Sequence, residues 1–214
     1  MHNTINNLSL IKKEINKINH NINIIAVTKT FKIDVIEPLL KFGHLHYGEN
    51  KVQESNDKWS GIKSKYKDIQ LHMIGKLQSN KVKIAVKLFD YIHSLDSMKL
   101  AKKISDEQSK INRNIKIFIQ VNIGNEDQKN GILKKDLKDF YANIKKELNL
   151  DVIGLMCIPP IDANPEDVFK IMKNLNDELN LKELSMGMSS DYLKAANSGS
   201  TFIRIGSKIF GARN

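Results

Sequence analysis

The chain has 214 residues, a formal net charge of +10 and a single cysteine, Cys157. One cysteine cannot form an internal disulfide, no apolar run reaches the roughly 18 residues that a membrane helix needs, and the polar N-terminus lacks the apolar core of a signal peptide. These features argue against secreted and membrane-spanning classes, and we expect one cytoplasmic domain, residues 1–214, without a membrane partner.

The chain opens with an amphipathic helix and then alternates strands with helices. Leu8, Ile11, Ile15 and Ile18 recur at helical spacing, and Asp34 with Glu37 forms a capping box for a second helix that Gly43 ends. Short apolar runs predict strands at 24–27, 45–47, 71–74, 91–93, 115–121, 152–158, 183–186 and 202–205. Later helices are predicted at 52–66, 81–88, 98–111, 136–148, 165–179 and 191–198, with Asn164 before Pro165 as an N-cap.

Eight strands that alternate with helices predict parallel pairing with right-handed crossovers. Eight such units close naturally into a (β/α)8 TIM barrel, here with an extra N-terminal helix. A doubly wound open sheet is the alternative.

The functional site of such a barrel lies at the carboxyl ends of its strands. Lys29 directly follows the first strand, where desolvation lowers the pKa of a lysine and suits it to a Schiff base with an aldehyde. An ordinary surface lysine is the alternative reading. Glu49 and Asn50 end the second strand, where we expect them to contact a ligand. An ion pair of Glu49 is the alternative.

The loops after the last two strands suit a phosphate group. Residues 185–189, Ser-Met-Gly-Met-Ser, offer two hydroxyls and a glycine whose backbone N–H can approach an anion. We expect Ser189 to cap the next helix, whose positive end favours phosphate. Gly206 and Ser207 offer the same combination on the last strand, and ordinary glycine turns are the alternative for both loops.

Almost all of the positive charge is lysine: only Arg113, Arg204 and Arg213 are arginines among 34 basic residues. Nucleic-acid surfaces favour arginine, whose planar fork binds phosphate and guanine edges bidentately. Lysine, asparagine and isoleucine share A/T-rich codons, so we expect codon drift to explain the charge and thirty of the 31 lysines to be solvated. Arg204 between two isoleucines indicates a need for the guanidinium, or a structural ion pair.

Histidines 44, 46, 72 and 93 lie on or near predicted strands, but only Glu49 is an obvious acidic ligand nearby. We therefore expect no metal site, and we expect Cys157 to be a core residue. The phosphate-loop, dinucleotide and nucleophile-elbow motifs are absent from the sequence.

Eight segments together resemble the successive motifs of one family. They are AVTKT (26–30), YGENKVQE (47–54), HMIGKLQSNK (72–81), QVNI (120–123), GLM (154–156), LSMGMS (184–189), GSTFIRIG (199–206) and IFGAR (209–213). The chain resembles the pyridoxal phosphate homeostasis proteins, also called the YggS or PROSC family, over nearly its whole length.

The resemblance implies a barrel of the alanine racemase N-terminal domain type that holds pyridoxal 5′-phosphate (PLP). Lys29 matches the Schiff-base lysine, Arg204 the arginine that faces the pyridine nitrogen, and Asn50 a residue near the ring. Matching positions around the phosphate are Ser185, Gly187, Gly206 and Ser207, and Met186 completes the cofactor-binding set. Lys51 stands where the family often has tyrosine, and Ser207 where threonine is usual.

The expected function is that of a monomeric PLP carrier without substantial turnover, which releases PLP to apo-enzymes and affects amino-acid and keto-acid balance. An arginine at the ring nitrogen keeps that nitrogen unprotonated, which weakens the ring as an electron sink. Racemisation also needs a second base, which an additional domain supplies in racemases, and the chain ends at Asn214 without one. A small amino-acid racemase and a nucleic-acid-binding module are the alternatives.

Overall fold

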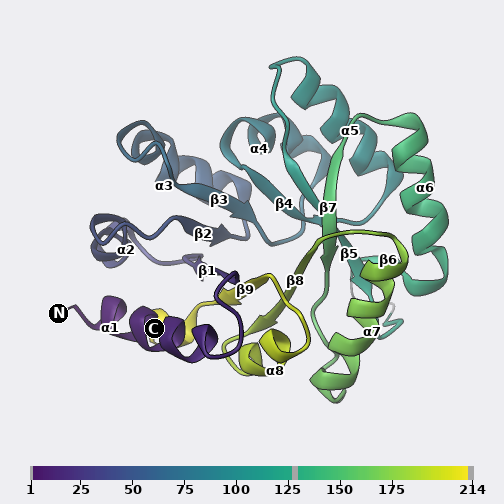
Figure 1. Ribbon diagram of the computed structural model, residues 1–214. Helices are drawn as coiled ribbons and strands as arrows, with labels where there is room; N and C mark the ends of the chain where they lie inside the picture. The colour runs from purple at the N-terminus through teal and green to yellow at the C-terminus, as the bar shows by residue number, and fades with distance from the viewer. Residues whose placement is uncertain (1, 127–129, 212–214) are drawn as a thin grey trace.

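Eight parallel strands close into a barrel with helices on its outside (Figure 1). This computed structural model describes residues 2–126 and 130–211. The barrel order is β4-β3-β2-β1-β9-β8-β7-β5, and pairing of β4 with β5 completes the circle. The predicted (β/α)8 barrel is confirmed, and the doubly wound open sheet is wrong because such a sheet has two unpaired edges.

The barrel strands lie where the apolar runs predict them, within a few residues at each end. They are β1 (Asn23–Val27), β2 (His46–Glu49), β3 (Gln70–Met73), β4 (Tyr91–Leu95), β5 (Lys116–Asn122), β7 (Asp151–Met156), β8 (Glu183–Met188) and β9 (Phe202–Ile205). No pattern in the sequence predicts β6 (Ile132–Leu133), which pairs with the end of β5. Its two residues are too short to show a period.

The helices follow the predicted alternation. They are α1 (Asn3–Asn16), α2 (Ile33–Lys41), α3 (Val52–Lys65), α4 (Val82–Leu88), α5 (Met98–Ser109), α6 (Leu137–Glu147), α7 (Pro165–Glu178), α8 (Tyr192–Asn197) and α9 (Ser207–Phe210). Short 3-10 turns at Ser79–Lys81 and Lys134–Asp136 precede α4 and α6. The four-residue helix α9 was not predicted.

Helix ends test the capping predictions individually. Asn164 caps α7 as predicted, because its side chain accepts a hydrogen bond from the backbone N–H of Glu166 at 3.2 Å. The capping box at Asp34 is wrong, since α2 already begins at Ile33 and Asp34 lies in its first turn. The predicted cap at Ser189 is also wrong, because Asp191 is the residue that precedes α8.

The extra N-terminal helix is present and packs against α9, α2 and α8. Leu8, Ile11 and Ile15 are buried, which confirms the periodic face over α1. Ile18 falls beyond the end of the helix and is 37% exposed, so it does not belong to that face.

Two apolar clusters hold the barrel together. A small cluster fills its interior with Ile25, Tyr91, Phe118, Met156 and Phe202. A larger cluster lies mainly between the strands and the surrounding helices. Cys157 is fully buried in the larger cluster, and burial raises the pKa of its thiol to about 12. It is therefore a core residue, as expected.

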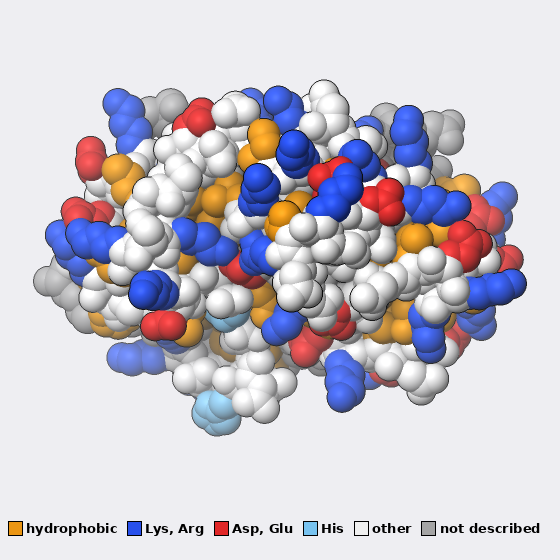
Figure 2. Space-filling view, turned by 90° about the horizontal axis from the view of Figure 1, so that it is seen from above, with side chains coloured by type: hydrophobic (Ala, Val, Ile, Leu, Met, Phe, Trp, Pro, Cys, Tyr) orange, Lys and Arg blue, Asp and Glu red, His pale blue; other side chains and the backbone are white. Residues whose placement is uncertain are grey.

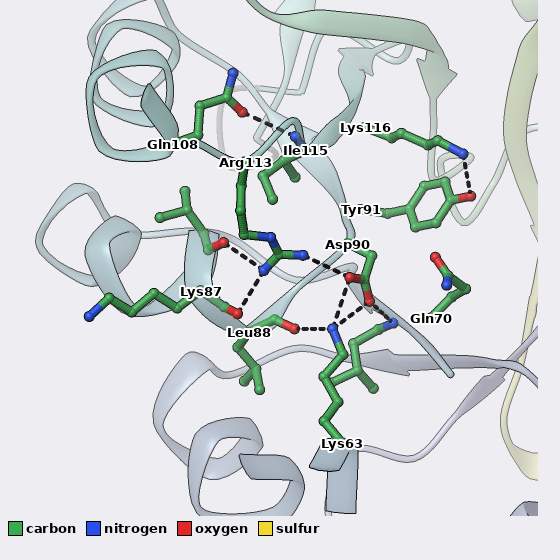
Figure 3. Close-up of polar contacts among 12 residues, drawn as sticks. Lys63, Gln70, Lys87, Leu88, Asp90, Tyr91, Gln108, Arg113, Ile115 and Lys116 are labelled. Carbon is green, nitrogen blue, oxygen red and sulfur yellow. Dashed lines mark hydrogen bonds and ion pairs between the residues drawn. The ribbon is translucent and has the colours of Figure 1, made fainter. Parts of the chain in front are cut away.

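A carboxylate at the amino ends of the strands joins three segments (Figure 3). Asp90 accepts hydrogen bonds from Lys63 Nζ at 2.7 Å, from Arg113 Nη2 at 2.8 Å and from the backbone N–H of Leu71 at 2.8 Å. Arg113 also donates to two carbonyl oxygens in the last turn of α4. This arginine therefore has a structural role, at the end of the barrel opposite the predicted site.

Basic and acidic side chains are interspersed on the face that Figure 2 shows. Exposed lysines pair with carboxylates at Lys41–Glu37 and Lys138–Glu178, with separations of 3.1 and 2.9 Å. A nucleic-acid surface gathers basic residues on one face or stripe, and this mixed pattern differs from that. No helix in residues 2–126 and 130–211 combines the length and apolar composition that crossing a membrane requires.

Candidate functional site

A cavity of about 890 Å³ opens at the carboxyl ends of the strands. The loops after β1, β2, β3, β7, β8 and β9 contribute to its wall. It is lined by Val27, Lys29, Asn50, Ile74, Gly75, Ile158, Met188, Ser189, Ser190, Arg204, Gly206, Ser207 and Lys208. The cavity therefore lies where a (β/α)8 barrel places its site, and its size suits a small molecule.

The electrostatics of the cavity favour an anion. Among the thirteen described residues that line it, Lys29, Arg204 and Lys208 are basic and none is acidic. Basic side chains therefore converge in this cavity, whereas basic and acidic side chains are interspersed on the face that Figure 2 shows. An anionic ligand would relieve the repulsion among these cations.

Lys29 is half-buried just after β1, and the chain is held on both sides of it. The carbonyl oxygen of Thr28 accepts a hydrogen bond from Lys58 Nζ at 2.9 Å, and the backbone N–H of Thr30 donates to Glu54 Oε1 at 2.7 Å. Thr30 has a φ of 69°, a conformation that a β-branched residue adopts only under strain. Helix α3 thus fixes the backbone from which the Lys29 side chain projects.

The buried carboxylate of Glu49 anchors this arrangement. Its Oε1 accepts hydrogen bonds from Thr28 Oγ1 at 2.7 Å, Lys58 Nζ at 3.0 Å and Trp59 Nε1 at 2.9 Å. Glu49 therefore forms the ion pair that was one of its two predicted roles. Lys58 is only 10% exposed, so the expectation that every lysine except Lys29 is solvated is wrong.

Asn50 follows β2 and lines the cavity. Its Oδ1 is buried without a hydrogen-bond partner among the described residues. Gly75 packs directly on the Asn50 backbone, since a Cβ at Gly75 would lie 2.4 Å from the Asn50 carbonyl oxygen. A buried acceptor without a partner fits a ligand that carries a donor, or a water molecule.

Arg204 projects from β9 and is 4% exposed. Its Nη1 donates to the carbonyl oxygen and to Oγ of Ser185, both at 2.7 Å, and its Nη2 donates to the Cys157 carbonyl oxygen at 2.8 Å. Burial lowers the pKa of Arg204, but a guanidinium stays charged in proteins. These acceptors are neutral oxygens, so the predicted alternative of a structural ion pair does not describe its hydrogen bonds.

Backbone N–H groups converge at the start of α9. Ser189 Oγ accepts from the N–H of Gly206 at 3.3 Å and from that of Lys208 at 3.5 Å. This explains why Ser189 does not cap α8: its hydroxyl bonds to the neighbouring loop instead. N–H groups that bind one hydroxyl oxygen are also suited to an oxygen of a phosphate.

Of the eight predicted site residues, Lys29, Asn50, Arg204, Gly206 and Ser207 line the cavity. The other three do not line it. Ser185 is buried beneath Arg204, Met186 packs in the larger core cluster, and Gly187 packs against α8.

Several lining residues were missed by the sequence reasoning. Met188 lies inside the predicted loop 185–189 but was not named as a site residue, and extending each predicted loop by one residue would have found Ser190 and Lys208. Ile74 and Ile158 carry no chemical signal in the sequence.

No group of three or more His, Cys, Asp or Glu side chains that could hold a metal ion occurs in residues 2–126 and 130–211. His46, His72 and His93 instead form hydrogen bonds with one another inside the barrel.

Comparison with known proteins points to one family. The sequence pattern of the family described as "Alanine racemase, N-terminal domain" matches residues 2–214. A protein named "Pyridoxal phosphate homeostasis protein" from Aquifex aeolicus is 39% identical over an alignment of 199 positions, which covers 89% of this chain and 86% of the relative. A protein of the same name from Haemophilus influenzae is 35% identical over an alignment of 225 positions, which covers 97% of this chain and 95% of the relative.

Solved structures agree with this grouping. PipY of Synechococcus elongatus PCC7942 with PLP bound is 32% identical and has a TM-score of 0.88, with 97% of this chain and 100% of that chain covered. An alanine racemase of Clostridium difficile 630 is 15% identical with a TM-score of 0.75, and this chain covers 57% of it. The second likeness is one of fold alone.

Proposed function

This chain belongs to the pyridoxal phosphate homeostasis protein family, and we propose that it binds PLP in the cavity at the carboxyl ends of its barrel strands. One observation carries the proposal: a half-buried lysine, a buried arginine and two converging backbone N–H groups meet around one cavity. Each of the three matches one part of PLP, namely its aldehyde, its pyridine ring and its phosphate.

The residues present fit the cofactor. Lys29 would hold the aldehyde carbon as a Schiff base, whose formation from an amine and an aldehyde releases one water. The N–H groups of Gly206 and Lys208, which bind the Ser189 hydroxyl, would hold phosphate oxygens together with the Ser207 hydroxyl and the Lys208 ammonium. Ser185, Met186 and Gly187 support this site from behind the cavity wall. PLP, when bound, supplies an electrophilic carbon that can be exchanged between amines.

Arg204 would face the pyridine nitrogen. A guanidinium carries only donors, so its hydrogen bond requires an unprotonated ring nitrogen. A second proton there would place two cations against each other. The unprotonated ring withdraws electrons weakly, which favours storage of the aldehyde over carbanion chemistry.

The proposed role is therefore to carry PLP and to supply it to apo-enzymes, with consequences for amino-acid and keto-acid balance. We further propose that residues 1–214 act as one PLP-binding domain and as a monomer. Transfer is tested by mixing the loaded protein with a PLP-dependent apo-enzyme and following its reactivation, with sedimentation measured in parallel. Sustained racemisation of alanine or serine above that of free PLP would instead support the enzyme alternative.

The binding site itself is tested by absorption spectroscopy. The purified protein loaded with PLP should show the visible absorption band that is typical of a protonated Schiff base. Lys29→Ala should abolish the band, while Lys32→Ala, an exposed lysine at the start of α2, should retain it. A band that survives Lys29→Ala would show that a different lysine holds the aldehyde.

A further inference from the structure

A line of hydrogen bonds crosses the barrel interior and ends at the cavity. His46 Nδ1 lies 3.0 Å from His72 Nε2, and His72 Nδ1 lies 2.9 Å from His93 Nε2. His93 Nδ1 lies 2.8 Å from Ser185 Oγ, which accepts from Arg204 Nη1 at 2.7 Å. We call these five residues the histidine chain. It joins β2, β3, β4, β8 and β9, and only Arg204 among its members lines the cavity.

Aromatic neighbours hold the two central rings in place. His72 stacks on Tyr91 with a centroid separation of 4.2 Å and an interplanar angle of 14°. His93 stacks on Phe118 at 4.3 Å and 19°. Both histidines are fully buried. Each ring therefore presents its two nitrogens along a fixed line.

The arginine sets the direction of the hydrogen bonds. A guanidinium can only donate, so Ser185 Oγ is the acceptor in its contact with Arg204. Among the described residues, His93 Nδ1 is the remaining partner of that hydroxyl. A buried hydroxyl proton needs an acceptor, and His93 Nδ1 is the partner within reach, so Ser185 Oγ donates to an unprotonated His93 Nδ1.

The directions of the other hydrogen bonds in the histidine chain follow from that of Ser185. A neutral His93 with an unprotonated Nδ1 carries its proton on Nε2 and donates it to His72 Nδ1. His72 is then protonated on Nε2 and donates to His46 Nδ1. Burial lowers the pKa of His72 and of His93 well below the usual value, and the Arg204 charge adds to this at His93. Neutral rings are what this pattern of donors requires.

We propose that His93 is a positioning residue of the cofactor site: through Ser185 it fixes the guanidinium of Arg204, and His72 and His46 orient His93 in turn. Hydrogen bonds that all point the same way polarise one another, so the Ser185 oxygen becomes a stronger acceptor for the buried cation. The role toward PLP rests on the proposed function. The orientation of Arg204 does not, because it is a property of the protein without PLP.

The first test measures the protein freed of PLP. Long-range ¹H–¹⁵N correlation spectra at neutral pH should show His46, His72 and His93 as neutral rings protonated on Nε2. Single His→Gln variants would assign the signals. A His93 ring that is charged, or protonated on Nδ1, would contradict the direction of the chain and overturn the proposal.

The second test compares two substitutions of His93. Asn can place its amide oxygen near the position of Nδ1 and so accept from Ser185, whereas Phe fills a similar volume without an acceptor. In the PLP-free protein, a fixed guanidinium gives separate Nη–H signals and a rotating one gives averaged signals. We expect separate signals for Arg204 in the native protein and in His93→Asn, and averaged signals in His93→Phe.

The PLP dissociation constant is the third readout. His93→Phe should weaken binding by about 10-fold, the scale of one charge-assisted hydrogen bond, and His93→Asn should restore most of the loss. His44 is a matched control, because it is buried but its Nε2 donates to the backbone carbonyl oxygen of His46, and its ring takes no part in the histidine chain. His44→Phe should leave PLP affinity unchanged.

The outcomes separate the two proposals. Equal losses in His93→Phe and His93→Asn, in step with their thermal stability, would reduce His93 to a packing role and overturn the inference. Unchanged affinity in His93→Phe, with the absorption band still dependent on Lys29, would overturn the inference and leave the proposed function standing. A native protein that takes up no PLP would reject the proposed function, while the spectra of the PLP-free protein would still decide whether His93 fixes Arg204.

Discussion

Thr28, directly after β1, and Glu49, at the end of β2, are joined by a hydrogen bond of 2.7 Å between Oγ1 and Oε1. Both side chains are fully buried. The bond connects the residue before Lys29 to a carboxylate that also binds Lys58 and Trp59. The position of the cavity lysine therefore depends on a network that does not itself line the cavity.

Glu49→Gln should weaken both the fold and the site. It removes a charge that compensates the nearly buried Lys58, and breaking such a pair costs about 3 kcal/mol. Urea unfolding would measure the loss of stability, and PLP titration the loss of affinity. Glu37→Gln is the matched control, since its pair with Lys41 is exposed and is worth at most about 0.5 kcal/mol. Equal stabilities for the two variants would show that the Glu49 network does not hold β1.

Gly187→Ala should destabilise the carboxyl end of β8. Gly187 has a φ of 91°, and an added Cβ would lie 2.5 Å from the Cβ of Ala195 in α8. Strain and overlap together predict a loss of about 2–4 kcal/mol. Gly61→Ala gives the opposite sign: Gly61 lies inside α3 with open space around it, so alanine should stabilise by about 0.5–1 kcal/mol. Thermal unfolding of both variants measures the difference.

Asp90→Ala should separate stability from ligand binding. Asp90 accepts hydrogen bonds from Lys63, Arg113 and the Leu71 N–H at the end of the barrel opposite the cavity (Figure 3). Its loss should cost about 3 kcal/mol because two partly buried cations lose their partner. PLP affinity, measured well below the melting temperature, should not change. A variant that loses affinity while it stays folded would link the two ends of the barrel.

Stability should fall steeply as the pH drops below about 6.5. Burial lowers the pKa of His44 to about 3 and that of His72 and His93 well below 6.5, whereas an unfolded histidine ionises near 6.5. The unfolded chain then binds protons that the folded chain does not, so its free energy falls relative to the folded state. Each buried histidine contributes a loss of about 2 kcal/mol between pH 6.5 and 5.

Urea midpoints at pH 7.5, 6 and 5, at constant ionic strength, measure this effect. His44→Gln should flatten the pH dependence, while His20→Gln, which alters an exposed side chain, should not. A midpoint that is the same at pH 5 and pH 7.5 would show that these histidines titrate alike in the folded and unfolded chains.

Much of the architecture follows from local pattern. Short β-branched runs separated by amphipathic segments require buried parallel strands, and Asn164-Pro165 starts α7 where the side chain can satisfy a free N–H. The prediction of individual helix caps failed where residues distant in sequence compete for one hydroxyl. Ser189 bonds to Gly206 and Lys208 across the loops, and no rule based on adjacent residues contains that choice.

The sequence by itself determined which side chains stand at the strand ends, and five of the eight residues predicted there line the cavity: Lys29, Asn50, Arg204, Gly206 and Ser207. Only the tertiary structure decided which neighbours face the cavity. Side chains alternate along a strand, and an irregular register between β8 and β9 places Ser185 behind Arg204 rather than in the wall.

The histidine chain also depends on both the sequence and the tertiary structure. His46, His72 and His93 are separated by more than 20 residues in sequence, and each by itself is a polar residue on an apolar strand. Barrel closure brings their rings together, and the charge of Arg204 then orients every proton between them. A hydrogen-bond direction is a property of the whole chain of contacts, so it becomes defined only when the strands have met.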